Sequence, residues 1–229
     1  MGIDGNVYAA KEAFSLTHKL NMKGLHLISD YDPFDTIWHD RPEIPKNPFF
    51  VLPEKYTGEP ARKKIARICD SIEKNGAQSL LVASLDTIAW IFNIRGNDVK
   101  CNPVTVSYAY ISRNETVLFI DPKKLSEETT SYLKAEGVTI AEYSRIYDYV
   151  SKIKTSVCLD SSKITFSLYN TIPTENRIVD IPSPADLMKS IKNEAEIQGF
   201  NNAMERDGVA LVRFFMWLEK AVPKGGVTE

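Results

Sequence analysis

Residues 88–108 read IAWIFNIRGNDVKCNPVTVSY, and this stretch decides the fold. Its apolar start, residues 88–92, predicts the last turn of a buried helix, and its end predicts a strand from residue 105 onward. Between them lies a polar elbow, in which Gly96 lets the backbone turn freely. An elbow that is anchored at both ends and rich in polar groups is well placed to face another domain.

Helices and strands alternate on both sides of this stretch. Apolar periodicity and the positions of glycine and proline predict helices over 9–23, 60–75, 85–92, 122–135, 144–153 and 184–191. Strands are predicted over 25–29, 79–83, 105–111, 116–120, 138–143, 157–159 and 177–181, and residues 164–169 form a short strand or turn. The alternation predicts an α/β fold with a mixed central sheet and helices on both faces.

Residues 30–58 are predicted to be a loop with one short helical turn around 34–38. They contain five prolines, which regular helices and central strands exclude. Within this loop we expect Trp38 in the core, and we expect Asp40 and Arg41 to form an ion pair at a structural corner.

A long helix is predicted over about 193–221. Its apolar residues exceed what one α/β domain needs at its edge: Leu211, Phe214, Phe215, Trp217 and Leu218. Because large apolar side chains are unfavourable in water, we expect this helix to pair with a second copy or to fold back. The ending FFMWLEKAVPKGGVTE, residues 214–229, is interpreted as the opening of a domain that the chain does not contain.

Composition excludes several functional classes. The formal net charge of −2 gives no electrostatic basis for binding nucleic acid or an anionic membrane. No window approaches the roughly 18 continuous apolar residues of a membrane span, and the N-terminus lacks the pattern of a signal peptide. The cysteines, Cys69, Cys101 and Cys158, are widely spaced and odd in number, which favours a reducing compartment over a disulfide framework.

A search for catalytic chemistry finds no centre. The histidines, His18, His26 and His39, lack the spacing of a metal site. The sequence contains no GxSxG elbow, no CxxC pair and no glycine-rich phosphate loop before a helix. We therefore predict no catalytic residue, no metal ligand and no cofactor in this chain.

Several segments resemble Xaa-Pro aminopeptidases of the cytosolic type, which are metallopeptidases of the creatinase/prolidase family. These segments keep the family's order and spacing over nearly the whole chain: IWHDRPEIP (37–45), YTG (56–58), LDTIAWIFNIRGNDVKCNPV (85–104), LFID (118–121) and WLEKAVPKGGVTE (217–229). The resemblance implies that residues 1–192 form a non-catalytic domain with a ribonuclease-H-like fold. It also implies that residues 193–229 are the first helix and the start of a truncated pita-bread catalytic domain.

The resemblance further implies what the parent protein does. It would remove an N-terminal residue that precedes proline, using two divalent metal ions, usually manganese, whose ligands lie beyond residue 229. The present chain would be inactive, cytoplasmic, and a partner of its own catalytic domain. Its domain would help to shape access to the active site and the arrangement of subunits, which allows a homo-oligomer.

One loop is singled out as a candidate for substrate access. Its candidate residues are Arg95, Asp98 and Asn102, since they lie in or beside the polar elbow. We expect substitution of Arg95 or Asp98 to lower the activity of the intact enzyme while changing its melting temperature little. The alternative is that Arg95 and Asp98 pair with each other and only shape the loop.

Two other functions stay open from the sequence. The chain could be a stand-alone, catalytically silent peptide-binding module on the same fold. It could also belong to an amidinohydrolase of the creatinase type. The metal identity, the preferred first residue of the substrate and the parent's oligomeric state do not follow from the sequence.

Overall fold

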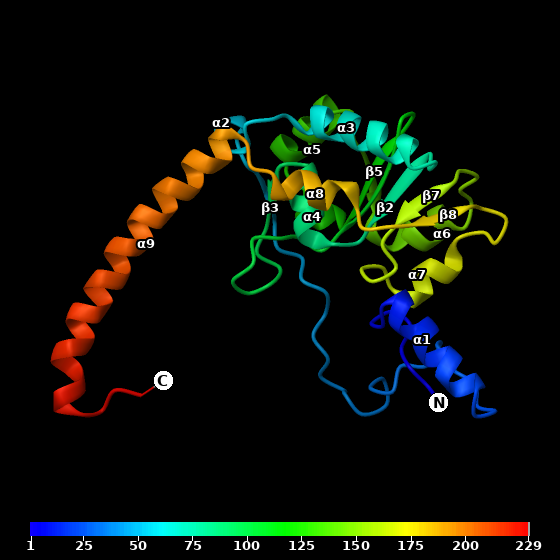
Figure 1. Ribbon diagram of the computed structural model, residues 1–229, viewed down its shortest axis with the longest axis horizontal. Coiled ribbons are helices and arrows are strands. Elements are labelled where there is room, and N and C mark those ends of the chain that lie inside the picture. Colours follow the sequence, from blue (N-terminus) through cyan, green and yellow to red (C-terminus); the bar gives the residue numbers. More distant parts are fainter. Residues whose placement is uncertain (229) are drawn as a thin grey trace.

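A six-stranded mixed sheet forms the centre of the computed structural model, which describes residues 1–228 (Figure 1). The strands lie in the order β6 (Thr139–Glu142), β5 (Thr116–Ile120), β4 (Tyr108–Ser112), β2 (Ser79–Val82), β7 (Val157–Leu159) and β8 (Ile178–Asp180). β4 pairs antiparallel with both β2 and β5, and the outer pairings are parallel. The predicted mixed sheet and the predicted 105–120 hairpin are therefore confirmed, although β4 begins three residues later than expected.

Helices cover both faces of this sheet, as predicted. Neighbouring residues of one strand point to opposite faces, so Leu80 and Leu118 enter one core while Leu81 and Phe119 enter the other. The first core is closed by α3 (Ala61–Lys74), α4 (Leu85–Ile91), α5 (Glu127–Ala135) and α8 (Pro184–Ser190). The second is closed by α1 (Ala10–Asn21), α6 (Ile146–Val150) and α7 (Phe166–Thr171).

A second, two-stranded sheet joins the start of the polar elbow to the segment that follows residues 22–48 of the chain. β1 (Phe50–Val51) pairs antiparallel with β3 (Ile94–Arg95), and the Leu52 amide donates to the Asn93 carbonyl at 2.7 Å. α2 (Glu54–Thr57) follows directly and ends at Gly58. Neither these short strands nor α2 was predicted, because two to four residues carry too little periodicity to detect.

Three predicted elements differ most from the structure, and the helix expected over 144–153 ends at Val150. The segment 25–29 is not a buried strand, since Leu25 and Ile28 are exposed and Ile28 makes only an isolated bridge to Gly2. Residues 166–171 form helix α7, whose N-cap Thr165 accepts a hydrogen bond from the Leu168 amide. The helix expected over 122–135 is interrupted, because η1 (Pro122–Lys124) ends before the capping box of Ser126 and Thr129 starts α5.

The arm, which we define as residues 22–48, crosses from α1 to β1 without regular secondary structure (Figure 1). Trp38 is 45% exposed, so its expected place in the core is wrong. Arg41 pairs with Asp32 rather than with Asp40, and its guanidinium lies over the Trp38 ring at 5.5 Å. Other large apolar side chains of the arm are also exposed: Leu25, Ile28, Tyr31, Phe34, Ile37 and Ile44.

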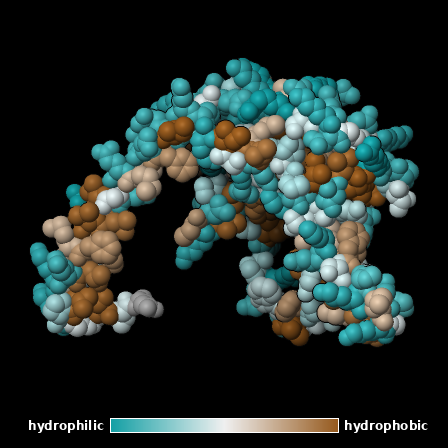
Figure 2. All heavy atoms as spheres, in the orientation of Figure 1, coloured by the Kyte–Doolittle hydropathy of each residue, from teal (hydrophilic) through white to brown (hydrophobic). Residues whose placement is uncertain are grey.

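The last helix, α9 (Glu194–Ala221), leaves the α/β body and continues into η3 (Val222–Lys224) (Figure 1). Apolar side chains line it, and the α/β body, α9 and the arm surround an open hollow (Figure 2). Leu211, Phe214, Phe215 and Trp217 are about half exposed, at 55%, 49%, 59% and 54%, whereas Leu218 is partly buried. The helix is thus uncovered as expected, and its pairing with a second copy stays a prediction. Within the described part of the chain, no helix is both long and apolar enough to cross a membrane.

The first turn of α9 is tied to the body at two points. Asn193 caps the helix by accepting the Glu196 amide, and its side-chain amide donates to the Thr57 carbonyl at 2.8 Å. The Glu196 carboxylate accepts one hydrogen bond from the Asn193 amide at 3.0 Å and another from the Trp90 indole at 3.1 Å. Because each capping residue also binds the body, the start of this helix and its attachment form one network.

Gly58 is required by this attachment. Its φ is +68°, and a Cβ there would lie 2.7 Å from the Asn193 Cγ atom. Gly137 is a matched control, because its φ is +78° and nothing lies within 4 Å of the place that a methyl group would take. We predict that Gly137→Ala lowers the free energy of unfolding by about 1 kcal/mol, the strain of a left-handed backbone.

We predict that Gly58→Ala loses about 1 kcal/mol more than Gly137→Ala, because the new methyl group also displaces the helix cap. Urea unfolding of both variants measures the difference. Equal losses would show that the contact between Gly58 and Asn193 does not hold the helix.

Candidate functional site

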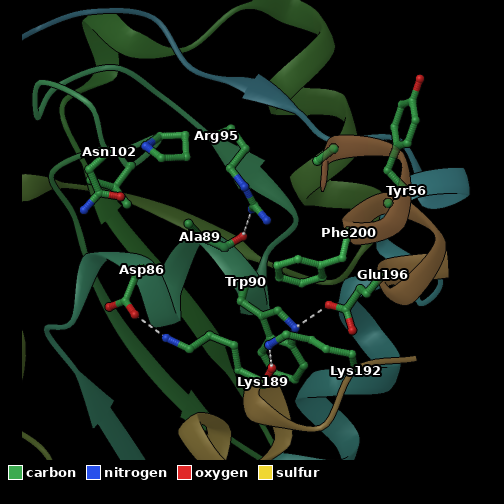
Figure 3. Close-up of a pocket in the computed structure, with 14 residues that line it drawn as sticks. Tyr56, Asp86, Ala89, Trp90, Arg95, Asn102, Lys189, Lys192, Glu196 and Phe200 are labelled. Carbon is green, nitrogen blue, oxygen red and sulfur yellow. Dashed lines mark hydrogen bonds and ion pairs between the residues drawn. The ribbon is translucent and has the colours of Figure 1, made fainter. Parts of the chain in front are cut away.

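A cleft of about 430 Å³ lies where the polar elbow meets the start of α9 (Figure 3). One wall comes from α4, β3 and residues 102–104, and the other from α8 and the first turns of α9. The side chains that line it include Asp86, Trp90, Arg95, Asn102, Lys189, Lys192, Glu196 and Phe200. Its volume falls in the range of about 300–1,000 Å³ that is typical of small-molecule pockets.

Arg95 caps the carboxyl end of α4. Its Nη1 atom donates to the Ala89 carbonyl at 2.7 Å and to the Ile94 carbonyl at 2.9 Å (Figure 3). Partial burial lowers the pKa of Arg95, and the negative charge of Glu196 partly offsets this effect. Across residues 1–228, no carboxylate lies within 4.0 Å of the guanidinium.

A buried lysine donates a hydrogen bond to a carbonyl at the same helix end. Lys64 on α3 is only 1% exposed, and its ammonium donates to the Trp90 carbonyl at 2.8 Å and to Asn93 Oδ1 at 2.7 Å. It also lies 4.4 Å from the centre of the Trp90 ring. Burial lowers the pKa of Lys64 to about 8. Cations at the carboxyl end of a helix satisfy its free carbonyls and oppose its dipole.

The cleft wall formed by α8 and the start of α9 carries further charged side chains. Lys189 pairs with Asp86, and Lys192 donates to the Lys189 carbonyl. Both oxygens of Glu196 already accept hydrogen bonds, from Trp90 and Asn193. The lining therefore holds three cationic side chains against two carboxylates, and the aromatic surfaces of Trp90 and Phe200 lie beside them.

Asp98 lies outside this cleft. Its side chain is fully buried and pairs with Lys124, which is 1% exposed, at 2.5 Å. The same oxygen accepts the Val106 amide at 2.7 Å and the Thr105 hydroxyl at 3.0 Å. Asp98 therefore closes the elbow from the inside and joins it to η1.

Residues 40–196 match the family model of the creatinase/prolidase N-terminal domain. The chain belongs to the creatinase/prolidase N-terminal domain family. The fold and the family resemblance expected from the sequence are both confirmed.

Relatives within this family are Xaa-Pro aminopeptidases. The probable Xaa-Pro aminopeptidase P of Botryotinia fuckeliana is 33% identical over 96% of this chain and 35% of its own length. Xaa-Pro aminopeptidase 1 of Dictyostelium discoideum is 38% identical over 79% of this chain and 29% of its own length.

A solved structure agrees with these relatives. The X-prolyl aminopeptidase of Caenorhabditis elegans, described as a cytosolic enzyme with a di-nuclear active site, superposes with a TM-score of 0.90 at 29% identity. The match covers 98% of this chain and 38% of the nematode protein. The chain thus spans between 29% and 38% of the length of these proteins.

In this creatinase/prolidase N-terminal domain, the three candidate residues separate. Arg95 and Asn102 line one cleft, whereas Asp98 is buried with Lys124. Arg95 and Asp98 do not pair with each other, so the alternative of a local Arg95–Asp98 ion pair is wrong. Gly96 serves a close approach, because a Cβ there would lie 2.9 Å from the Val104 carbonyl oxygen.

Several residues of the site were not predicted from the sequence. Lys64, which is buried and does not line the cleft, had a usable signal, since it precedes Ile68 and Ile72 by four and eight residues and so shares their buried helix stripe. Lys189, Lys192, Glu196 and Phe200 had none, because only the folded chain brings the start of α9 to the elbow.

The described residues do not fit a metal centre. Between residues 1 and 228, no group of three or more His, Cys, Asp or Glu side chains is arranged to hold a metal ion. The cleft instead presents hydrogen-bond donors, positive charge and aromatic surface, which suit the binding of a carbonyl or carboxylate group.

Asp98→Ala should strongly destabilise the domain, which reverses the expectation drawn from the sequence. It leaves the Lys124 charge buried without its partner, a change that costs about 3–5 kcal/mol in comparable sites. Glu43→Ala, which breaks the exposed Lys46–Glu43 pair, is the control and should change little. Urea unfolding compares them, and a similar small loss for both would contradict the buried-pair argument.

Lys64 should make stability depend on pH. Its folded pKa of about 8 lies below the unfolded value, which is about 10.4. Between these values the unfolded chain binds more protons, so the free energy of unfolding should rise with pH. Lys64→Met should lack this rise, whereas the exposed neighbour variant Lys63→Met should keep it. Parallel pH profiles for Lys64→Met and wild type would show that Lys64 is not the titrating group.

Proposed function

We propose that this chain is the non-catalytic domain of a metal-dependent Xaa-Pro aminopeptidase. The parent would release an N-terminal residue that precedes proline, with two divalent ions, usually manganese, acting on the bond. The observation that carries the proposal is the match to the nematode X-prolyl aminopeptidase over 98% of this chain. The metal ligands would come from the part of the relatives that this chain does not span.

The proposed boundary between domains lies at residues 192 and 193. Residues 1–192 would be the creatinase/prolidase N-terminal-like domain, and 193–229 the first helix and start of the catalytic domain. The network of Asn193, Glu196, Trp90 and Thr57 supports this role, since it holds the first turn of α9 against the body. The exposed apolar side chains of α9 would then pack on the catalytic domain or on a second subunit.

The domain would also help to wall the entrance to the active site. Of the three candidate residues, Arg95 and Asn102 line the cleft, while Asp98 would act by holding the elbow in shape. We place the parent protein in the cytoplasm, in line with the nematode enzyme, which is described as cytosolic.

Activity should require the remainder of the parent protein. We predict that the purified chain does not cleave a Xaa-Pro peptide with manganese present, whereas the same chain joined to the remaining catalytic portion does, and that a chelator abolishes this activity. Release of the N-terminal amino acid measures both. Chelator-sensitive turnover by the chain alone would overturn the proposal. So would a full-length protein that cleaves peptides equally well with and without proline in the second position.

Two further assays of the full-length protein separate the alternatives. A full-length protein that hydrolyses an amidine-bearing substrate would indicate an amidinohydrolase. A protein with no turnover in any form that still binds peptide would indicate a silent binding module.

A further inference from the structure

Arg95 has unused hydrogen-bonding capacity. A guanidinium carries five N–H donors, and both contacts made by Arg95 run through Nη1. In residues 1–228, its Nε and Nη2 atoms have no hydrogen-bond acceptor. A partly desolvated cation with free donors is a costly arrangement unless another group completes it.

The two hydrogen bonds made by Nη1 fix the orientation of the Arg95 guanidinium group. Its Nη1 atom is held by the end of α4, so the guanidinium plane cannot turn freely. Nε and Nη2 then present the edge that receives a carboxylate through two parallel hydrogen bonds. An arginine held in place in this way loses less conformational freedom when it binds a ligand.

The charges around Arg95 favour an anion over a neutral ligand. Lys189 and Asp86 pair with each other and offset each other's charge. Of the remaining charges in the lining, Arg95 and Lys192 are positive and only Glu196 is negative, which leaves one net positive charge. Both oxygens of Glu196 already accept hydrogen bonds, from Trp90 and Asn193.

The apolar part of the cleft favours a ligand that carries an apolar group beside its carboxylate. The Phe200 ring is 55% exposed and extends into the cleft from the α9 side, whereas Arg95 extends from the α4 side (Figure 3). The Trp90 ring also lines the cleft, beside Phe200 (Figure 3), and a volume of about 430 Å³ accommodates a few residues of peptide.

We propose that this cleft binds the free C-terminal carboxylate of a short peptide. The carboxylate lies on the Nε–Nη2 edge of Arg95, and the apolar side chain or ring of the terminal residue lies against Phe200 and Trp90. The inference rests on the proposed function, because it takes peptides as the substrate class. It goes beyond that function by assigning Arg95 to one end of the peptide.

Calorimetric titration of the chain with Ala-Pro-Ala and with its C-terminal amide tests the assignment. The amide should bind about tenfold more weakly or worse, because charge-assisted hydrogen bonds to the guanidinium are lost. Sodium acetate is a third ligand that distinguishes a peptide terminus from any carboxylate. Acetate should bind at least about tenfold more weakly than the peptide, since it lacks the apolar body.

Matched variants locate the site. Arg95→Gln should abolish the preference for the free acid, and Arg145→Gln, which removes an exposed arginine paired with Asp148, should preserve it. Phe200→Ala should weaken peptide binding several-fold, while Phe214→Ala on the same helix should not. Since Arg95→Gln removes a helix cap, circular dichroism checks its fold, and Phe200→Ala tests the site without touching that cap.

Equal binding of acid and amide, equal binding of acetate and peptide, or indifference to Phe200→Ala would each overturn the assignment. These measurements use the chain without turnover, so their failure leaves the proposed peptidase function standing. Failure of the full-length activity with intact acid-selective binding would reject the function and keep the site.

Discussion

The carboxyl end of α4 is held by two cations that arrive from opposite sides. Arg95 satisfies the Ala89 carbonyl and Lys64 satisfies the Trp90 carbonyl. Without them the helix would end among apolar residues with unpaired carbonyls, which is unfavourable in a buried place. Because these bonds set where the chain turns after Phe92, they also place β3, the elbow and the cleft. One local requirement, that the carbonyls at the end of α4 find donors, therefore sets the helix end, the small sheet with β1 and the orientation of Arg95.

This requirement also explains why the two charged residues of the elbow behave differently. Arg95 reaches back to α4 and keeps one edge toward the cleft, whereas Asp98 turns inward to Lys124. A buried pair of this kind contributes little net stability when intact but is strongly unfavourable when one member is lost. The elbow is thus shaped by one paired charge and one charge without a carboxylate among the described residues, a difference that only the folded structure reveals.

The sequence predicts the large elements well and the site only in part. Strong periodicity places α3 and the β4–β5 hairpin, because α3 buries a regular stripe and the strands alternate between the two faces of the sheet. It also places α9, although that helix buries none of its residues. It fails at residues 25–29, where LHLIS has the composition of a buried strand but lies in the exposed arm. The site depends on contacts such as Trp90–Glu196, which join residues 106 positions apart. No local pattern carries that information.

The attachment of α9 has a mechanical consequence. The helix has 28 residues, so at 1.5 Å per residue it acts as a rigid lever about 42 Å long. A tilt of about 5° at its first turn moves the far end by about 4 Å, which exceeds the length of a hydrogen bond. A few bonds at Asn193 and Glu196 therefore govern the position of the residues at the far end of α9. A small change near Gly58 is expected to displace those residues, tens of ångströms away, without touching any of them.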